Sequence, residues 1–237
     1  MPDTIRIDRD DRGVATLWLT RAEKHNALSR PMMDELTQAA ADLGADASVR
    51  VVVLAAEGGS FCAGGDLGWM REQMAADDAT RREGARALAG MLSALNLLPK
   101  PLIARVQGNA FGGGVGMMAV SDIVVAADTA RFGLTEVRLG LIPATIGPYV
   151  LARMGEPAAR RVFFSARLFD AAEAVDLNLV SRRVAVADLD AAVEAEVAPF
   201  LQAAPGAVAA AKAQCRALGP RIDAAVIEDS IDRLVAV

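Results

Sequence analysis

The sequence has little that could hold a metal ion or build a disulfide framework. Its 237 residues include two cysteines, Cys62 and Cys215, and a single histidine, His25. Two cysteines so far apart are too few for a disulfide-stapled fold or a closed zinc site. We therefore predict no metal, and because no secretory signal opens the chain, we expect a reducing, cytoplasmic location.

An excess of positive charge and a long hydrophobic run are also lacking. The chain carries 25 basic and 30 acidic residues, a net charge of −5. This balance offers no electrostatic attraction for nucleic acid or an anionic membrane surface. Charges or glycines interrupt every apolar run well before the roughly 20 residues that a membrane span requires. We expect a soluble protein whose partner is a small molecule, with no nucleic acid and no membrane.

What the sequence does contain is an alternation of strand and helix patterns. The segments TIRIDR and VATLWL alternate around the turn DRG, which predicts a strand pair. Ser29 is the expected N-cap of a helix that has Pro31 in its first turn and ends at Gly44. The unbroken apolar run VRVVVLAAE is typical of a strand buried on both faces.

The same order repeats along the chain. A predicted loop, GGSFCAGGD, precedes a helical stretch with a leucine stripe, the strand LIARV, the helix GGGVGMMAV and the strand DIVVAAD. Strands become rare after about Pro157, where alanine increases. We predict an α/β fold with a core at residues 1–185 and a smaller helical region at 186–237.

Two glycine-rich segments, CAGGDL and AFGGGVG, lie where predicted strands lead into helices. A helix N-terminus offers free N–H groups, and glycine lets a ligand oxygen approach the backbone. Two such ends could stabilise the negative charge that develops on a carbonyl oxygen. Each segment alone is equally consistent with a tight turn. The triple glycine of the second segment is not a dinucleotide-binding fingerprint, because a G-x-G-x-x-G pattern that begins at Gly112 would need glycine where Met117 stands. It is not a Walker loop either, because no Gly-Lys-Ser/Thr follows.

Glu136 is the candidate proton-transfer group. It lies in the segment RFGLTEVRLGLIPATIGPYV among Leu134, Val137, Leu139 and Leu141. Apolar surroundings raise the pKa of a carboxyl group toward the range that suits a general acid or base. Taken alone, the stretch favours an exposed glutamate or an ion-pair partner of Arg138 over a catalytic residue.

These segments, together, resemble the crotonase superfamily of enoyl-CoA hydratases and isomerases. The matching motifs are NALS, FCAGGDL, KPLIARVQGNAFGGGVGM, SDIVVAADTARFGLTEVRLGLIP and AVDLNLVSRRV. They follow one another in the family's order over nearly the whole chain, and the sequence is closest in look to bacterial hydratases of the methylglutaconyl-CoA kind. The resemblance implies a spiral of ββα units with a C-terminal helical region, trimers or hexamers, and an acyl-CoA thioester as substrate, with no separate cofactor.

The resemblance also assigns roles to residues. The N–H groups of Gly65 and Gly113 would form the oxyanion hole for the thioester carbonyl, and Glu136 would be the acid/base. A further set would line the CoA channel: Lys24, Ala63, Asp66 and Leu67. Lys24 remains equally consistent with a solvated loop residue.

One departure from the family leaves the reaction open. Two-glutamate hydratases have an acid two residues beyond the triple glycine, where this chain has Gly116. By likeness we favour hydration of a 2-enoyl-CoA; the alternatives are a Δ3,Δ2-enoyl-CoA isomerase, which needs one carboxylate, and a non-catalytic paralog. Aromatic dehalogenation is disfavoured, since Ala144 and Thr145 stand where relatives carry an aspartate nucleophile.

Two further points concern the substrate and the C-terminal end. Arg138 and Arg153 could serve a distal carboxylate on the acyl chain, although structural salt bridges are the expected use of both. The family's usual final helical segment, which helps to cover an active site, is expected to be shortened here. That shortening would affect the CoA cover and the trimer contacts.

Overall fold

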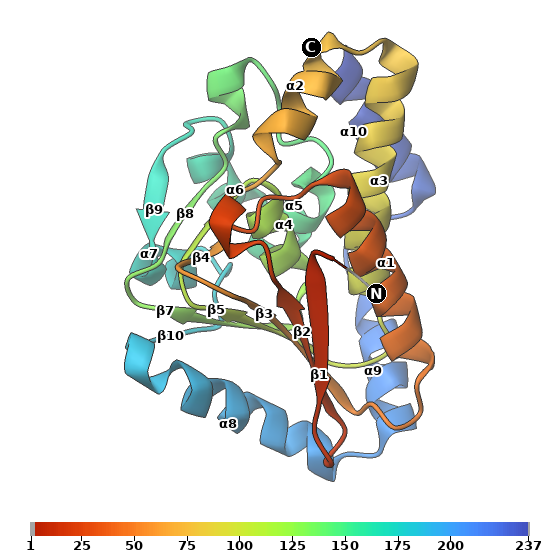
Figure 1. Cartoon of the computed structure of the whole chain (residues 1–237), viewed down its shortest axis with the longest axis vertical. Coiled ribbons are helices and arrows are strands. Elements are labelled where there is room, and N and C mark those ends of the chain that lie inside the picture. Colours follow the sequence, from red (N-terminus) through yellow and green to blue (C-terminus); the bar gives the residue numbers. More distant parts are fainter. Residues whose placement is uncertain (1–2, 237) are drawn as a thin grey trace.

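The computed structural model describes residues 3–236, which form ten strands and ten α-helices (Figure 1). The strands are β1 (Ile5–Arg9), β2 (Val14–Leu19), β3 (Val51–Ala56), β4 (Ser60–Cys62), β5 (Leu102–Val106), β6 (Asn109–Phe111), β7 (Ile123–Ala127), β8 (Arg131–Gly133), β9 (Leu168–Asp170) and β10 (Arg182–Val184). The helices are α1 (Arg30–Ala45), α2 (Leu67–Ala75), α3 (Asp78–Leu97), α4 (Gly113–Val120), α5 (Gly147–Met154), α6 (Glu156–Phe163), α7 (Ala171–Asp176), α8 (Leu189–Gln202), α9 (Pro205–Leu218) and α10 (Ala224–Val235).

The strands form two sheets. The larger has the order β1-β2-β3-β5-β7-β10 and is parallel apart from the β1–β2 hairpin. The smaller has the order β4-β6-β8-β9, in which only β9 runs antiparallel. Successive strands β3–β4, β5–β6 and β7–β8 each place one strand in each sheet before the chain turns into a helix. This arrangement confirms the predicted α/β class and its ββα repeat.

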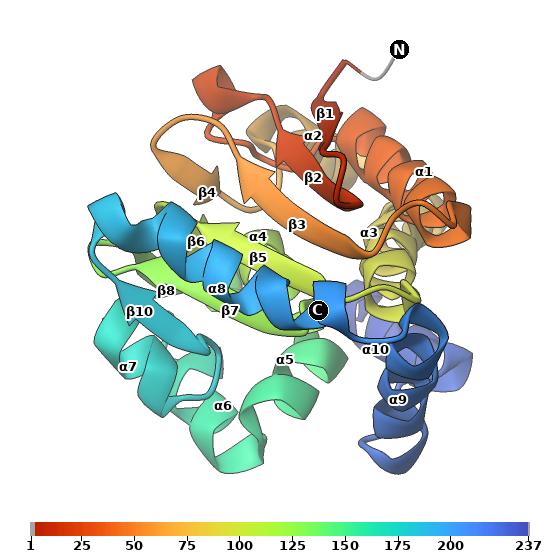
Figure 2. The same ribbon diagram turned by 90° about the horizontal axis from the view of Figure 1, so that it is seen from below.

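Strand β3 shows why its sequence is apolar throughout. Its six residues are all buried, because both faces of the sheet are covered. Val51, Val53 and Ala55 pack in the core beneath α8, which crosses that face of the sheet (Figure 2). Val52 and Leu54 point into the larger core on the opposite face, toward α1, α3 and α4. Side chains of β3 alternate between the two faces of the sheet, but polarity does not alternate along its sequence because both faces are buried, as expected for a parallel sheet.

The first elements agree with the sequence prediction, with one correction. Ile5 pairs with Leu19 in the antiparallel hairpin, and the Ser29 hydroxyl accepts a hydrogen bond from the Met32 N–H at 3.4 Å at the start of α1. The prediction that Gly44 ends this helix is wrong, since α1 continues to Ala45. Gly44 packs closely against the chain after α3, since a Cβ there would lie 3.1 Å from Pro99 Cδ.

The sequence patterns did not predict the smaller sheet. The segment predicted as a loop, GGSFCAGGD, contains β4, and the connection after LIARV contains β6. The glycine-rich segments therefore follow β4 and β6, not β3 and β5. Strands of three residues show no measurable periodicity, so their pairing depends on neighbours that are distant in the chain.

The end of the described chain is helical and returns to the body of the molecule. Helix α10 packs against α3 and α5, and in Figure 1 it lies behind α3. Arg86 forms an ion pair with Glu228 at 2.9 Å, and Arg82 pairs with Asp232. Ile231, on the inner face of α10, is fully buried. The division after residue 185 stays a prediction.

None of the helices in residues 3–236 combines the length and apolar character that crossing a membrane would need.

Candidate active site

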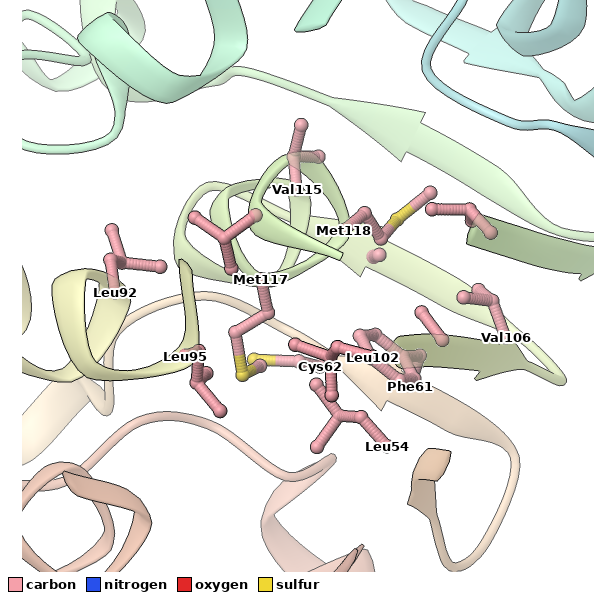
Figure 3. Packing of buried hydrophobic residues seen from close by; sticks show 14 of the residues in the cluster. Leu54, Phe61, Cys62, Leu92, Leu95, Leu102, Val106, Val115, Met117 and Met118 are labelled. Atoms are coloured by element: carbon pink, nitrogen blue, oxygen red, sulfur yellow. The ribbon is translucent and has the colours of Figure 1, made fainter. Parts of the chain in front are cut away.

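Helix α4 is embedded in the core, and this explains its glycines. Figure 3 shows side chains from α3, β3 and β4, such as Leu92, Leu54 and Phe61, packed around it. Seven of its eight residues are buried. A Cβ on Gly114 would lie 2.6 Å from the carbonyl oxygen of Cys62, which is closer than two such atoms can approach. The helix is therefore held against β4 by contacts that no larger residue allows.

The N-terminus of α4 is fixed by two more glycines. Gly112 has a φ of +48°, which side chains other than hydrogen rarely permit. A Cβ on Gly113 would lie 2.5 Å from Leu28 Cδ1, so the helix begins directly against this buried leucine. Gly113 is the first residue of α4, and its N–H has no acceptor within the helix.

The second glycine loop is held by the same leucine. The Leu28 N–H donates to the Gly64 carbonyl at 2.7 Å, and the Asp66 N–H donates to the Leu28 carbonyl at 2.9 Å. These bonds fix the chain on both sides of Gly65 and leave the Gly65 N–H without a protein acceptor within residues 3–236. Asp66 then caps α2 by accepting from the Gly68 N–H at 2.9 Å.

The two loops are in direct contact. A Cβ on Gly64 would lie 3.3 Å from the Phe111 carbonyl oxygen and 4.0 Å from Gly112 Cα. Leu28 joins them, because its backbone pairs with the first loop and its side chain packs on Gly113 of the second. The structure therefore places Gly65 and Gly113, whose N–H groups have no protein acceptor in the described chain, beside Leu28 and in the lining of one cavity. Such a pair of fixed donors can stabilise an oxyanion.

Glu136 lies beside these loops at the start of a 3₁₀ turn, Glu136–Leu139. Its Oε1 is 3.1 Å from the position that a Cβ on Gly112 would occupy, so the missing side chain leaves room for the carboxyl group. Its Oε2 is buried and has no hydrogen-bond partner in the described chain. Burial raises the pKa of Glu136, against a smaller lowering by its own backbone N–H. A carboxyl group in this state is suited to exchange protons.

These groups line one cavity of about 580 Å³. Most of its wall is apolar, with Met70 and Leu88 from the α2–α3 side and Leu234 and Val235 from α10. Arg81 is the one cationic residue among those that line it in the described chain. Helix α10 thus closes one side of the cavity of its own chain. This enclosure was not foreseen, since no motif marks α2, α3 or α10 in the sequence.

Most of the residues singled out in the sequence meet at this cavity. Ala63 and Leu67 line it together with Gly65, Gly113 and Glu136.

Two of the predicted CoA-channel residues lie outside the lining. The Asp66 side chain caps α2 and forms an ion pair with Arg21 at 2.9 Å. Lys24 is exposed on the 3₁₀ turn Ala22–Lys24. For both residues, contact with CoA stays a prediction.

Gly116 is surrounded by hydrocarbon. A Cβ there would lie 2.7 Å from Ile146 Cγ2 and 3.4 Å from Leu92 Cδ2. Two apolar side chains therefore occupy the space that a side chain at position 116 would need. Glu136 is the one carboxylate among the cavity-lining residues of the described chain.

The two arginines considered for a distal carboxylate do not line the cavity. Arg153 donates to the carbonyl oxygens of Ser121 and Asn178, at 2.9 and 3.0 Å, and burial lowers its pKa. The expectation of a salt bridge at this residue needs correction, since its hydrogen bonds go to carbonyls and a hydroxyl. Arg138 is exposed.

The two cysteines are both free. Cys62 is buried, and burial raises the pKa of its thiol to about 12, whereas Cys215 is exposed. In the part of the chain that the structure describes, no three His, Cys, Asp or Glu side chains are close enough to hold a metal ion.

Comparison with known proteins identifies relatives of the whole chain. The family model of enoyl-CoA hydratase/isomerase matches residues 9–229. The structure superposes on an enoyl-CoA hydratase from Shewanella pealeana with a TM-score of 0.89 and 36% identity, over 100% of this chain and 88% of that one. It superposes on AtuE of Pseudomonas aeruginosa with a TM-score of 0.87 and 36% identity, over 99% and 91% of the two chains. The predicted crotonase-like spiral is thereby confirmed.

The alignments with two sequence relatives cover a smaller share of those proteins than the structural superpositions do. The Alternaria alternata enoyl-CoA hydratase AKT6-1 is 40% identical over 155 residues, which are 65% of this chain and 50% of that protein. A Mycobacterium bovis protein named probable enoyl-CoA hydratase EchA17 is 37% identical over 204 residues, 86% of this chain and 77% of its own. The chain therefore belongs to the enoyl-CoA hydratase/isomerase family.

Proposed function

We propose that the protein hydrates a 2-enoyl-CoA thioester, using one glutamate and two backbone N–H groups. The observation that carries the proposal is the meeting of three groups at one cavity. The N–H groups of Gly65 and Gly113 have no protein acceptor in the described chain, and the pKa of Glu136 is raised by burial. Hydration of a conjugated thioester needs donors for the developing enolate and a group that moves a proton.

In the proposed reaction, the thioester carbonyl oxygen accepts hydrogen bonds from Gly65 and Gly113. A water oxygen attacks Cβ while Glu136, as the carboxylate, takes a proton from that water. The π electrons of the double bond move onto the carbonyl oxygen as an enolate, which the two N–H groups stabilise. Glu136 then donates its proton to Cα, and the 3-hydroxyacyl-CoA product forms with Glu136 again ionised. A raised pKa makes Glu136 a stronger base in the first step.

A specific observation favours a second candidate, Δ3,Δ2-enoyl-CoA isomerisation. Ile146 and Leu92 fill the space around Gly116, so a second carboxylate has no room there. Moving a proton from one substrate carbon to another requires a single base, which Glu136 supplies. A non-catalytic role is disfavoured by the same features, because a buried carboxyl oxygen without a partner is costly to keep.

We further propose that the CoA moiety lies along the loop from Ala63 to Leu67, near Lys24, and that CoA is part of the substrate and not a separate cofactor. We also propose that the protein forms a homotrimer or a hexamer and that it is located in the cytoplasm. Family likeness supports these assignments.

The purified protein should be incubated separately with crotonyl-CoA, 3-methylglutaconyl-CoA and 3-hexenoyl-CoA, following the ultraviolet absorbance of the conjugated enoyl thioester. Loss of absorbance with either of the first two substrates is the expected result. Gain with 3-hexenoyl-CoA alone would make the protein an isomerase. No change with any of the three would favour the non-catalytic paralog. The Glu136→Gln variant is the control for contaminating activity.

A further inference from the structure

The cavity that holds Glu136 contains one cationic side chain whose hydrogen bonds are incomplete. Arg81, near the start of α3, is the one cationic residue among the lining residues of the described chain. Its Nε is buried and has no hydrogen-bond partner within residues 3–236. Its other contacts are weak, since Nη2 donates to the Met74 carbonyl at 3.3 Å and Nη1 lies 4.0 Å from the exposed carboxylate of Asp78. This guanidinium therefore has donors to offer to a ligand.

The neighbouring arginines of α3 are used differently. Arg82 forms an ion pair with Asp232 of α10, and Arg86 forms one with Glu228 at 2.9 Å. Neither of these arginines is among the cavity-lining residues of the described chain. They hold α10 against α3, whereas Arg81 lines the cavity without a close carboxylate. The attachment of α10 therefore does not account for Arg81.

Helix α3 places Arg81 at a distance from the oxyanion donors. Arg81, Ala85 and Leu88 all line the cavity, and their spacing puts them on one face of the helix. Leu88 marks the donor end, because a Cβ on Gly113 would lie 3.9 Å from Leu88 Cδ1. Arg81 lies two helical turns earlier, roughly 10 Å along the axis. An anion bound by Arg81 would thus be well separated from the thioester carbonyl.

Helix α2 leads from the donors to the same end of the cavity. A Cβ on Gly65 would lie 3.0 Å from Met70 Cγ, so the first turn of α2 packs on this donor loop. A Cβ on Gly84, which lies about one helical turn after Arg81, would overlap the Gln73 side chain. Gln73 also lines the cavity. The lining is therefore apolar near the donors and carries a guanidinium and an amide farther along.

Helix α10 covers part of the end where Arg81 lies. Arg82, the next residue, pairs with Asp232, and Leu234 and Val235 in the following turn of α10 line the cavity. The CoA arm of a thioester carries a nucleotide and must leave the cavity, whereas the acyl arm can end inside it. A covered end with a guanidinium therefore suits an acyl chain that itself ends in an anion.

We propose that the substrate is an enoyl-CoA whose acyl chain ends in a carboxylate, and that Arg81 binds this carboxylate. The inference rests on the proposed function and names the substrate class of the same site. The guanidinium turns from the Met74 carbonyl so that Nε and one Nη donate in parallel to the two carboxylate oxygens. The Gln73 amide can donate a further hydrogen bond. Arg81 determines specificity and takes no part in the proton transfer by Glu136.

Binding of saturated thioesters tests the proposal without turnover, since they have no double bond to hydrate. Glutaryl-CoA and adipoyl-CoA carry a terminal carboxylate, and pentanoyl-CoA and hexanoyl-CoA are their uncharged counterparts of equal chain length. In calorimetric titrations, the wild type should bind at least one carboxylated thioester more tightly than its counterpart. Arg81→Met should weaken that binding about 10- to 100-fold, the range expected for hydrogen bonds to a charged group. Binding of the uncharged thioesters should change less than about threefold.

Two further variants control the test. Arg81→Lys keeps the charge without the planar fork and should restore part of the binding. Arg71→Met removes an exposed arginine of α2 that is not among the cavity-lining residues, and it should leave the binding of both classes unchanged.

The outcomes separate this proposal from the proposed function. Equal weakening of carboxylated and uncharged thioesters in Arg81→Met would assign Arg81 to a phosphate of CoA and overturn the proposal. No weakening of either class would overturn it as well. A wild-type protein that shows the expected binding but hydrates no enoyl-CoA would overturn the hydratase function alone. A wild-type protein that binds none of the four thioesters would overturn both.

Discussion

The contact between Gly116 and Ile146 predicts a strong energetic coupling between these two positions. In the Gly116→Ala variant, the new Cβ would lie 2.7 Å from Ile146 Cγ2 and 3.2 Å from Ile146 Cβ. Ile146 is 2% exposed and Leu92 fully buried, so neither can turn toward solvent. Overpacking of this kind costs about 1–3 kcal/mol. The better helix propensity of alanine returns about 1 kcal/mol, which leaves a net loss of stability of up to about 2 kcal/mol.

The second variant of the pair makes the test sharp. Ile146→Ala alone should cost about 2–4 kcal/mol, because it removes buried methyl groups and leaves a cavity. In the double variant, Cγ2 is gone and the new methyl at position 116 fills part of that cavity. The double variant should therefore be more stable than the two single changes imply, by about 1–2 kcal/mol.

Urea unfolding, followed by both circular dichroism and tryptophan fluorescence, measures the four free energies of unfolding, and equal slopes in urea ensure that they are comparable. Additivity within about 0.5 kcal/mol would contradict the packing account. A Gly116→Ala variant more stable than the wild type would also contradict it, since helix propensity alone would then decide the outcome.

Three further predictions concern the site and its cover. Gly113→Ala should lower kcat for hydration at least about tenfold, because the new Cβ would clash with Leu28 and displace the backbone N–H of residue 113. An unchanged kcat would count against this N–H as a hydrogen-bond donor to the substrate. Because the pKa of Glu136 is raised in the folded state, that state binds more protons than the unfolded state once the pH exceeds the ordinary glutamate pKa of about 4.3. The free energy of unfolding should therefore fall as the pH rises from about 4.3 through the raised pKa of Glu136. Glu136→Gln should gain stability over the wild type across that window, and a pH-independent difference in urea midpoints would be inconsistent with the shift. Ile231→Ala should cost about 2–4 kcal/mol and speed amide exchange in α10. Arg86→Ala should cost much less, since its ion pair with Glu228 is exposed; similar losses in both variants would refute the apolar anchoring of α10.

The larger sheet and the first helix could be predicted because their patterns are local. The alternation in β1 and β2, the Ser29 cap and the apolar run of β3 each express one element over enough residues to be recognised. Strands β4, β6 and β8 have three residues each, too few for a period. Their pairing comes from tertiary contacts that no local pattern contains.

The site divides in the same way. The apolar neighbours of Glu136 in sequence were enough to predict the direction of its pKa shift. The approach of the two glycine loops could be expected only from family likeness, because it depends on Leu28 bridging them. The packing of Ile146 on Gly116, 30 positions apart in the chain, could not be read from spacing. Nor could the place of Arg81 in the cavity wall.

The measurement that tests the central claim most directly separates binding from turnover in Glu136→Gln. Glutamine keeps the shape of the side chain but cannot accept and return a proton. Calorimetric titration with butyryl-CoA should give a dissociation constant within about threefold of the wild type, while turnover of crotonyl-CoA falls about 10²- to 10⁴-fold. Near-normal turnover in this variant would contradict the assignment of Glu136 as the proton-transfer group.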